Sequence, residues 1–527
     1  MDVAETGCHW FVCILGMMCA MESAVGIDLG TTYSAVAILD QNNDPRTLLN
    51  SAGEPLTPSM MCFEGPRVVV GRGAAKAIST QYENVADCPK RDLGERVFRK
   101  VINGRQYPPE VLQAWILRKL WRDAQRQIGP LTKAVITVPA YFDEVRRKAT
   151  MDAGWMAGID VLDIINEPTA AALAFGIQQG RLFEIGQTNV PRRILVYDLG
   201  GGTFDVTVME IDGGQYRTLA TDGDMRLGGW DWDQRIVALV ADELVRSIGF
   251  DPFEDQQFSG NLWLKCEQAK RELSIKARTA ISFDLKGKSF HIELSREEFE
   301  NRTRDLLDRT MFTVEQTLQE AGLEMDQLDI VLMVGGSTRM PSVVRRLRSI
   351  SGKEPTRSLS PDEAVAHGAA IRAGMILSSH VPGQGSLNVK NVNSHSLGVV
   401  GMDPDKKQHR NGIVIPRNTS LSVVAKRTFF TSKPNQRSIK VSIVEGESAN
   451  PADCSLLGKC SIESIPRDLP VRTPIEVSFR YEENGRLKVS VQVKGVDSRL
   501  THHLHRENTL TQEQMEGWRD FIDQSCE

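Results

Sequence analysis

One stretch of this chain, Ile194 to Ile211, constrains its fold more than any other. It opens with an apolar run, which predicts a buried strand, and closes with alternating residues typical of a strand returning beside the first. Between them lie Asp198, three consecutive glycines, Thr203 and Asp205. Glycines allow a tight turn and let backbone N–H groups approach an anion. We interpret the stretch as a hairpin suited to a phosphate chain carrying Mg²⁺, which prefers one or two carboxylates and several waters.

A second copy of this plan strengthens the interpretation, because a single glycine-rich turn also occurs in ordinary hairpins and bulges. The stretch Val25 to Leu39 repeats it, with Asp28 standing 170 residues before Asp198. Here too a strand ends in an aspartate, followed by Leu-Gly, hydroxyl residues and a returning strand. Two equivalent hairpins predict a duplicated α/β fold whose halves face each other across a cleft. A nucleotide in that cleft would meet one acid and one set of amides from each half.

The two motifs, Asp28-Leu-Gly-Thr-Thr and Asp198-Leu-Gly-Gly-Gly-Thr-Phe-Asp, resemble the phosphate motifs of the actin-like ATPase superfamily. More narrowly, the chain resembles the heat-shock protein 70 (DnaK-type) chaperones from about Ala24 to Val493. The resemblance implies an α/β fold, with a duplicated actin-like (ribonuclease H-like) ATPase domain followed by a small antiparallel β-sandwich. It implies a Mg²⁺-dependent ATPase with ATP and ADP as ligands, acting as a chaperone on unfolded or extended polypeptide. J-domain and nucleotide-exchange co-chaperones are further partners that the resemblance implies.

The resemblance also carries over catalytic roles residue by residue. It implies that Lys90, Glu167, Asp198 and Thr203 are catalytic, and that Asp28 and Asp198 hold Mg²⁺ through water. From the residues alone, Lys90 is typical of a solvated lysine in a charged loop. Glu167 alone is typical of an acid at a helix start, which the helix dipole stabilises.

The resemblance implies that the nucleotide contacts both hairpins, one helix and one strand–diglycine–helix segment. On the helix, polar residues at spacings of three and four share a face, which the sequence alone would assign to solvent. The diglycine lets the backbone approach a nucleotide, and the helix N-terminus beyond it favours an anion. The predicted nucleotide-binding residues are Gly30, Thr31, Thr32, Tyr33, Gly200, Gly201, Gly202, Thr203, Glu267, Lys270, Arg271, Ser274, Gly335, Gly336, Ser337, Arg339 and Asp362.

The C-terminal part has short alternating strands and an Asn484-Gly485 turn, which predict an antiparallel β-sandwich. The same residue pattern also fits the core of any sandwich, so an assignment of apolar positions to a peptide cleft rests on the resemblance. The predicted peptide-binding residues, carried over by position, are Val399, Met402, Phe429, Gln436, Ile439 and Val441.

The amino-acid composition argues against some classes of function. The formal charge is −5, from 63 basic and 68 acidic residues that are interspersed, so no basic face for nucleic acid is expected. The 9 cysteines lack the paired spacing of a zinc site or disulfide framework, which favours reduced thiols and a cytoplasmic protein.

Five segments are predicted. Residues 1–22 lack the positively charged start of a secretory signal peptide. Their apolar run is also too short to form a stable membrane span, so we expect an extension outside the fold. A weak membrane or export segment is the alternative for them. The remaining segments are the ATPase domain (23–380), the interdomain linker (381–395), the peptide-binding sandwich (396–500) and a C-terminal tail with a truncated lid helix (501–527).

Three departures from the family pattern predict weak coupling. The linker reads Leu387-Asn-Val-Lys-Asn391 instead of leucines between acids, so docking it would desolvate Lys390. Asp163 stands where the family carries a basic residue used in J-domain docking, which predicts repulsion and weak J-domain stimulation. The chain ends soon after a helix expected at Thr511 to Gln524, which predicts rapid peptide release.

Two other functions fit parts of the sequence. One is a binding module that holds ATP as a switch with little turnover and serves another chaperone. The other is a small-molecule kinase of the same superfamily. The predicted β-sandwich argues against the kinase, and retention of Lys90, Glu167 and Thr203 argues against an inactive ATPase.

Overall fold

The computed structural model describes residues 23–525 apart from 183–190, 213, 286, 358–359, 379–387, 404–407, 432–435, 437, 464–468, 483–486, 494–498 and 503–509. The predicted N-terminal extension (1–22), the first part of the predicted linker and the Asn484-Gly485 turn therefore lie outside the described residues.

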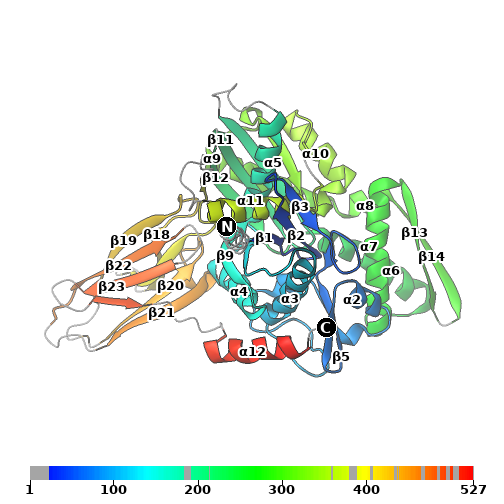
Figure 1. Ribbon diagram of the computed structural model, residues 1–527, viewed down its shortest axis with the longest axis horizontal. Helices are drawn as coiled ribbons and strands as arrows, with labels where there is room; N and C mark the ends of the chain where they lie inside the picture. The colour runs from blue at the N-terminus through cyan, green and yellow to red at the C-terminus, as the bar shows by residue number, and fades with distance from the viewer. Residues whose placement is uncertain are drawn as a thin grey trace, which may run out of the picture.

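Two sheets of similar plan form the larger part of the molecule (Figure 1). In the first, of order β3-β2-β1-β8-β9, strands β1 and β2 are the antiparallel hairpin around Asp28, and β8 pairs parallel to β1. In the second, of order β15-β10-β11-β12-β16, β10 and β11 are the hairpin around Asp198, and β15 pairs parallel to β10. The predicted duplicated α/β fold is therefore confirmed. The strands are β1 (Ala24–Asp28), β2 (Tyr33–Leu39), β3 (Pro45–Leu48), β8 (Lys133–Val138), β9 (Asp160–Asn166), β10 (Arg192–Leu199), β11 (Phe204–Asp212), β12 (Gln215–Asp224), β15 (Ile330–Val334) and β16 (Asn388–Lys390).

Two helices join the halves. Helices α5 (Glu167–Leu182) and α11 (Ala364–Ser378) bury alanine-rich faces in one core with apolar residues of both sheets. They cross so closely that a Cβ on Gly368 would lie 1.8 Å from the carbonyl oxygen of Ala170. Small residues at this crossing let the two halves approach each other and bring their hairpins to one cleft.

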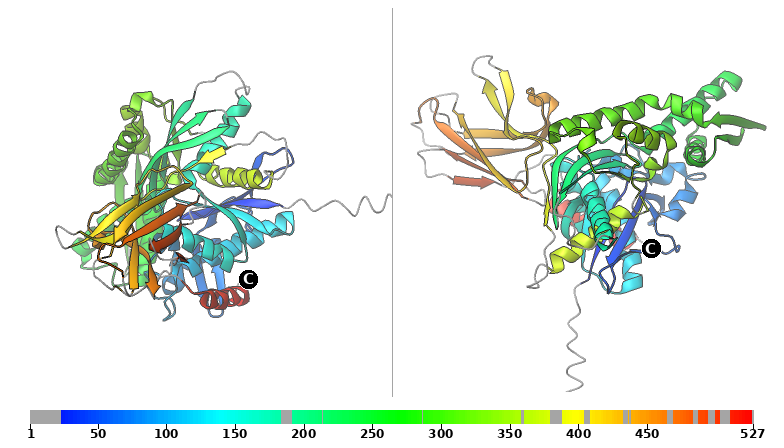
Figure 2. Two further views of the ribbon diagram at one scale, coloured as in Figure 1. Left: turned by 90° about the vertical axis from the view of Figure 1, so that its left-hand side faces the viewer. Right: turned by 90° about the horizontal axis from the view of Figure 1, so that it is seen from above.

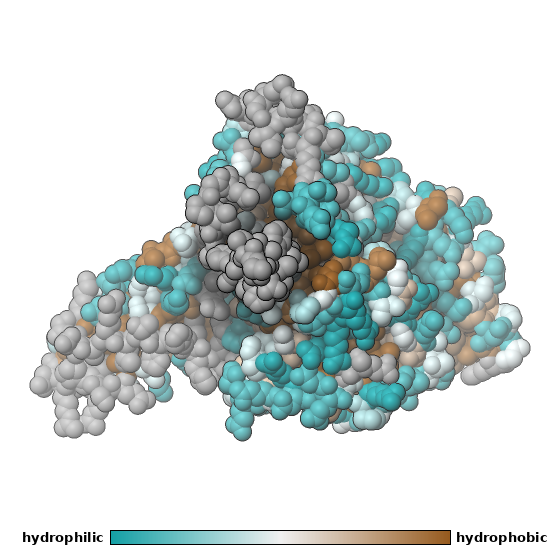
Figure 3. Space-filling view, viewed as in Figure 1, coloured by the Kyte–Doolittle hydropathy of each residue, from teal (hydrophilic) through white to brown (hydrophobic). Residues whose placement is uncertain are grey.

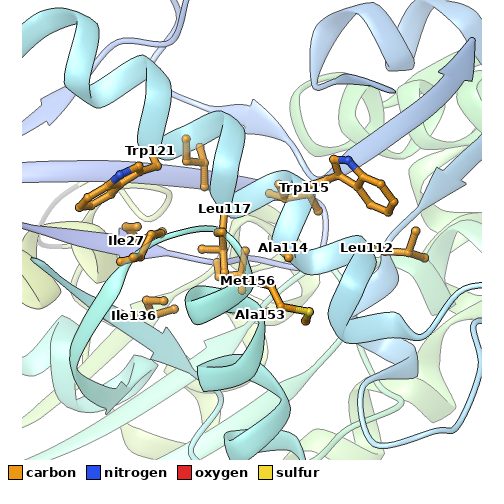
Figure 4. Close-up of a cluster of buried hydrophobic side chains, with 14 of the residues drawn as sticks. Ile27, Leu112, Ala114, Trp115, Leu117, Trp121, Ile136, Ala153 and Met156 are labelled. Atoms are coloured by element: carbon orange, nitrogen blue, oxygen red, sulfur yellow. The ribbon is translucent and has the colours of Figure 1, made fainter. Parts of the chain in front are cut away.

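Outer helices cover the remaining sheet faces. Helix α3 (Pro109–Ile128) is amphipathic and packs with α4 (Glu144–Met156) over the first sheet, with Trp115 and Trp121 buried (Figure 4). Around the second sheet lie α6 (Gly229–Ile248), α7 (Gln256–Ile275), α9 (Arg304–Ala321) and α10 (Pro341–Ser351). These form a separate core with the faces of β10 and β11. Each half thus has a hydrophobic core of its own, besides the core that α5 and α11 form with both sheets.

A two-sheet β-sandwich projects from one side of this body (Figures 1 and 2). Its sheets have the strand orders β18-β17-β20-β21 and β19-β22-β23-β24, with antiparallel pairing throughout, as the sequence predicts. Alternate residues of both sheets form one core. The strands are β17 (Leu397–Asp403), β18 (Gln408–Ile415), β19 (Val423–Phe430), β20 (Ser438–Glu445), β21 (Ser455–Glu463), β22 (Pro474–Tyr481), β23 (Leu487–Val493) and β24 (Arg499–His502).

The helix expected from Thr511 is α12 (Gln512–Ser525), and Thr511 caps it through a hydroxyl that accepts from the Gln514 N–H at 3.2 Å. It packs against α3 and α4, where Ile522 is fully buried (Figure 1). The indole N–H of Trp115 donates to Ser525 at 3.1 Å. The C-terminal helix is thus part of the core of the first half.

The described surface is mostly hydrophilic on the face seen in Figure 3, with apolar side chains largely recessed. In the part of the chain that the structure describes, no helix has the length and apolar character needed to cross a bilayer. The five described cysteines are all free thiols.

Candidate active site

A cavity of about 570 Å³ lies between the two hairpins. Every residue predicted for catalysis, Mg²⁺ or nucleotide lines it, except Gly202. Gly202 packs directly behind, where a Cβ would lie 2.5 Å from the methyl carbon of Thr31. The cavity also has lining residues that sequence reasoning missed, and these are Leu56, Ile275, Val334, Met340, Arg357, Pro361 and Val365.

The hairpins are in direct contact at the cavity floor. A Cβ on Gly201 would lie 1.8 Å from the hydroxyl oxygen of Thr32, so a larger residue there would require the Thr32 side chain to move. Gly200 donates its N–H to the Thr203 carbonyl at 3.0 Å, which closes the turn between β10 and β11. Backbone and hydroxyl groups of both halves therefore face one space, as expected for a site that holds a phosphate chain.

Acidic side chains crowd this floor. Burial, followed by the nearby charge of Glu167, raises the pKa of Asp28 to about 7 and that of Asp198 well above its usual range. The same two causes raise the pKa of Asp205 to about 7. Lys90 donates to Glu167 at 2.6 Å, and both side chains are buried. The surrounding carboxyl groups outnumber this lysine, so the floor is suited to an additional cation.

Two partners of these acids were not predicted from the sequence. The Thr137 hydroxyl on β8 donates to Asp28 at 3.1 Å, and the Tyr141 N–H donates to Asp205 at 2.9 Å. Asp205 is fully buried behind the cavity and does not line it. Its position as the second acid of the hairpin was the one available signal, whereas nothing in the sequence pairs Thr137 with Asp28.

The face of α7 lines the other end of the cavity, and it is not the freely solvated face that its sequence alone predicts. The Lys270 ammonium donates to Asp233 at 2.7 Å and to the Gly229 carbonyl at 2.8 Å. Arg271 donates to Glu267 at 2.6 Å and to the Tyr33 hydroxyl at 2.9 Å. Asp233, from α6, was missed because it has no role in the motif and lies 37 residues from Lys270.

Arg339 and Asp362 meet at the rim of the same cavity, at 2.6 Å. Ser337 reaches back to the turn of the second hairpin and donates to the Gly200 carbonyl at 2.8 Å. These contacts bring the segment after β15 against the Asp198 hairpin. The predicted strand–diglycine–helix segment therefore lies where it can contact a nucleotide in the cavity.

The prediction that docking of the linker would desolvate Lys390 is wrong. Residues Asn388–Lys390 form strand β16, which pairs parallel to β12 of the second half. Strand alternation directs Val389 into the core, where it is buried, and leaves Asn388 and Lys390 exposed. Docking therefore desolvates a valine and not an ammonium group.

We expect this one valine to determine whether the linker docks. Val389→Lys would place a charge in an apolar core and should abolish stimulation of ATP turnover by peptide, whereas Lys390→Leu should leave it unchanged. The measurement is steady-state ATP turnover with and without an unfolded polypeptide, for both variants. Equal loss of stimulation in both would contradict the alternation of buried and exposed positions.

The expectation that Asp163 presents a free negative charge is also wrong. Asp163 accepts from Arg372 of α11 at 2.8 Å, and its side chain is only 10% exposed. The charge is therefore paired within the protein and offers little repulsion to an acidic partner. Sequence reasoning missed the pair because the two residues are 209 positions apart.

The sandwich contacts the first half mainly through buried polar groups. Glu445 at the end of β20 accepts from the Glu144 N–H, at the start of α4, at 3.1 Å. Burial, followed by the charge of Asp143, raises the pKa of Glu445 well above its usual range. Arg147 and Arg146 oppose this rise, and Glu447 adds to it. Docking of the two domains therefore favours the protonated form of Glu445.

This linkage predicts that docking weakens as pH rises. A carboxyl whose pKa is raised by docking contributes fully below its ordinary pKa, and the contribution is lost as pH rises through the raised value. His395, at the same interface, has its pKa lowered by burial, which favours its neutral form. We expect small-angle scattering to give a larger radius of gyration at about pH 8.5 than at about pH 6.5. Glu445→Gln should remove that difference, and persistence of the difference in this variant would assign it to another group.

The predicted peptide-binding residues do not all share one exposed surface. Phe429 packs partly against the sandwich core, with Gly401 and Gly412 beneath its ring. Met402 is 53% exposed, and Gln436 is partly buried and donates to the Ser438 carbonyl at 2.9 Å. The remaining three are buried in the sandwich core, and they are Val399, Ile439 and Val441.

Comparison with known proteins matches nearly the whole chain. A family model described as "Hsp70 protein" matches residues 24–103 and 94–520. The chain is 38% identical over 510 residues to the chaperone protein DnaK of Mycoplasmopsis synoviae, covering 94% of this chain and 81% of that protein. It is 39% identical over 530 residues to a chaperone protein DnaK of Thermus thermophilus, covering 94% and 82%. Against the chaperone protein DnaK of Mesomycoplasma hyopneumoniae strain J it is 40% identical over 510 residues, covering 94% and 80%.

Proposed function

Because this chain belongs to the Hsp70 family, we propose that the cavity between its two hairpins is the site of ATP hydrolysis. The protein is an ATP-hydrolysing chaperone that binds unfolded polypeptide. We assign the ATPase domain to residues 23–380, the linker to 381–395 and the peptide-binding domain to 396–500. The observation that carries the site assignment is the meeting of Asp28, Asp198, Lys90 and Glu167 on the cavity floor.

The residues present fit Mg²⁺. Buried carboxyl groups with raised pKa values surround the buried Lys90–Glu167 ion pair, and a divalent cation would offset their repulsion. Among the described residues, no three His, Cys, Asp or Glu side chains are placed to chelate a metal directly. Mg²⁺ usually keeps several waters, so Asp28 and Asp198 would hold it through water. When bound, the ion would neutralise charge on the phosphates.

The proposed reaction is in-line attack of water on the γ-phosphate. Glu167 accepts a hydrogen bond from the attacking water and orients it. The Lys90 ammonium, held by Glu167 at 2.6 Å, stabilises the charge that develops on the transferred phosphoryl group. The Thr203 hydroxyl and the backbone N–H groups of the glycine turn orient the phosphate chain.

The nucleoside end of ATP would lie along α7. Arg271 offers a planar guanidinium to the base, while Glu267 and Lys270 reach the ribose. Lys270 is already oriented by Asp233, which fixes its ammonium at the cavity wall. Asp362 and Arg339 close the opposite rim of the cavity.

Isotope labelling tests this reaction against the two alternatives. ATP hydrolysed in ¹⁸O-enriched water should give inorganic phosphate with one solvent oxygen per turnover, because water is the nucleophile. A switch with little turnover would release almost no phosphate, and a small-molecule kinase would transfer the γ-phosphoryl group to its acceptor instead of releasing it as labelled inorganic phosphate. Either outcome would overturn the assignment of Glu167 to the attacking water.

The finer partner and location assignments are proposals as well. J-domain proteins are proposed to act where β16 docks on the second half, since this junction joins linker, α5 and β12 through Val389 and Asn391. Nucleotide-exchange factors are proposed to act by opening the cleft. The free thiols of the described cysteines support a reducing compartment, for which we propose the cytoplasm.

A further inference from the structure

Arg91 connects the two halves of the molecule across the cleft. It follows Lys90 in the short helix η2 (Pro89–Asp92), whose neighbour Leu93 belongs to the core of the first half. Its guanidinium donates to both carboxylate oxygens of Asp231 in the second half, each at 3.2 Å. The two side chains are 11% and 15% exposed, so solvent screens this pair only partly.

Two tryptophans of the second half extend this contact. The Arg91 guanidinium carbon lies 4.3 Å from the ring centroid of Trp230, within the range of a cation–π interaction. Trp230 in turn stacks on Trp263 of α7, with centroids 4.9 Å apart and an interplanar angle of 17°. The result is a layered stack of one cation and two indole rings.

Two hydrogen bonds hold Asp231 and Trp230 in place. Asp231 also accepts from the Gly228 N–H at 2.8 Å, which anchors it at the start of α6. The backbone N–H of Trp230 donates to the Gly201 carbonyl at 2.8 Å, so the stack is tied to the phosphate hairpin itself. None of Arg91, Trp230, Asp231 and Trp263 lines the cavity. They therefore lie outside the space in which the nucleotide is proposed to bind.

We propose that Arg91, Trp230, Asp231 and Trp263 form a clamp across the cleft that sets the rate at which nucleotide leaves. Opening the cleft moves the first half away from the second, so it must break the forked ion pair and the guanidinium–indole contact together. The packing of Tyr82 against α7 at Gly260 is a separate contact between the halves. The clamp differs from it in being charged and in lying directly behind the phosphate turn. This proposal rests on the proposed placement of nucleotide in the cavity.

Release of N-methylanthraniloyl-ADP from the full chain, followed by stopped flow with excess ATP, tests the clamp. We expect Arg91→Ala to accelerate release about tenfold or more, because a partly buried charge pair and a cation–π contact are lost together. Arg91→Lys keeps the charge but loses the fork and the planar stacking, so release should be intermediate. Arg99→Lys is the matched control, since Arg99 pairs with Asp87 and Asp92 and stacks on Phe98 within the first half.

A double variant separates the clamp from a general loosening of the fold. Members of one clamp give non-additive effects, so Arg91→Ala with Trp230→Ala should release nucleotide within about twofold of Arg91→Ala alone. The clamp would be overturned if the accelerations caused by Arg91→Ala and Trp230→Ala multiplied in the double variant. It would also be overturned if Arg99→Lys accelerated release as much as Arg91→Lys does. Release by Arg91→Lys within about twofold of wild type would also overturn it, and this holds even if Arg91→Ala does not fold. Failure of the wild-type protein to bind the labelled ADP would instead refute the proposed nucleotide site.

Discussion

Asp198→Asn is expected to abolish Mg²⁺-dependent ATP hydrolysis, lowering turnover by about 10³-fold or more. Asp198 lies at the end of β10, is buried, and faces the cavity between Glu167 and Asp28. Asparagine keeps the shape of the side chain but removes the charge that the metal shell requires. Stability should not fall, because burial and neighbouring acids already disfavour the charged form of Asp198.

Single-turnover hydrolysis and thermal unfolding together make the measurement. Asp212→Asn is the matched control, because Asp212 ends the same hairpin but is exposed to solvent. The control should hydrolyse ATP at the wild-type rate. Substantial Mg²⁺-dependent turnover in Asp198→Asn would remove this residue from the metal site.

Lys90→Ala is expected to lower turnover by about 10²-fold or more while nucleotide still binds. Lys90 holds the only ammonium group that lines the phosphate end of the cavity among the described residues, and Lys270 lies at the nucleoside end. The variant should also lose stability by about 3–5 kcal/mol, because Glu167 then lies buried without its partner. Turnover and stability therefore fall for different reasons.

A second substitution separates the two effects. Adding Glu167→Gln to Lys90→Ala removes the unpaired charge and should restore most of the stability, as followed by denaturant unfolding. Turnover should stay low, because neither stabilisation of phosphoryl charge nor orientation of water is restored. Recovery of turnover together with stability would show that Lys90 has only a structural role.

Much of the fold and of the nucleotide cavity could be predicted from sequence because both depend on local signals. The two strand–Asp–Gly hairpins can be recognised from consecutive residues, and their duplication implies a cleft. The cavity-lining residues of α7 share a helical face, which spacing reveals. Roles such as that of Glu167, however, came from the resemblance, since a helix-start acid alone indicates only a favourable dipole.

The remaining features depend on contacts between distant segments. Asp163 and Arg372 are 209 residues apart, and no pattern in either segment indicates that they pair. The linker strand has three residues, so which side chain is buried depends on its register against β12. No local pattern therefore predicts that Val389 is buried and Lys390 exposed. The Arg91–Trp230 contact likewise requires closure of the two halves.

Peptide-stimulated ATP turnover by the full chain tests most directly whether hydrolysis is coupled to polypeptide binding. The rate of phosphate release would be measured with saturating ATP and Mg²⁺, without peptide and with increasing unfolded polypeptide. We predict that peptide raises the rate in the wild-type protein and leaves it unchanged in Val389→Lys, in which β16 cannot dock. A wild-type rate that peptide does not change, in a protein that hydrolyses ATP and binds the same peptide, would contradict coupling through the docked linker.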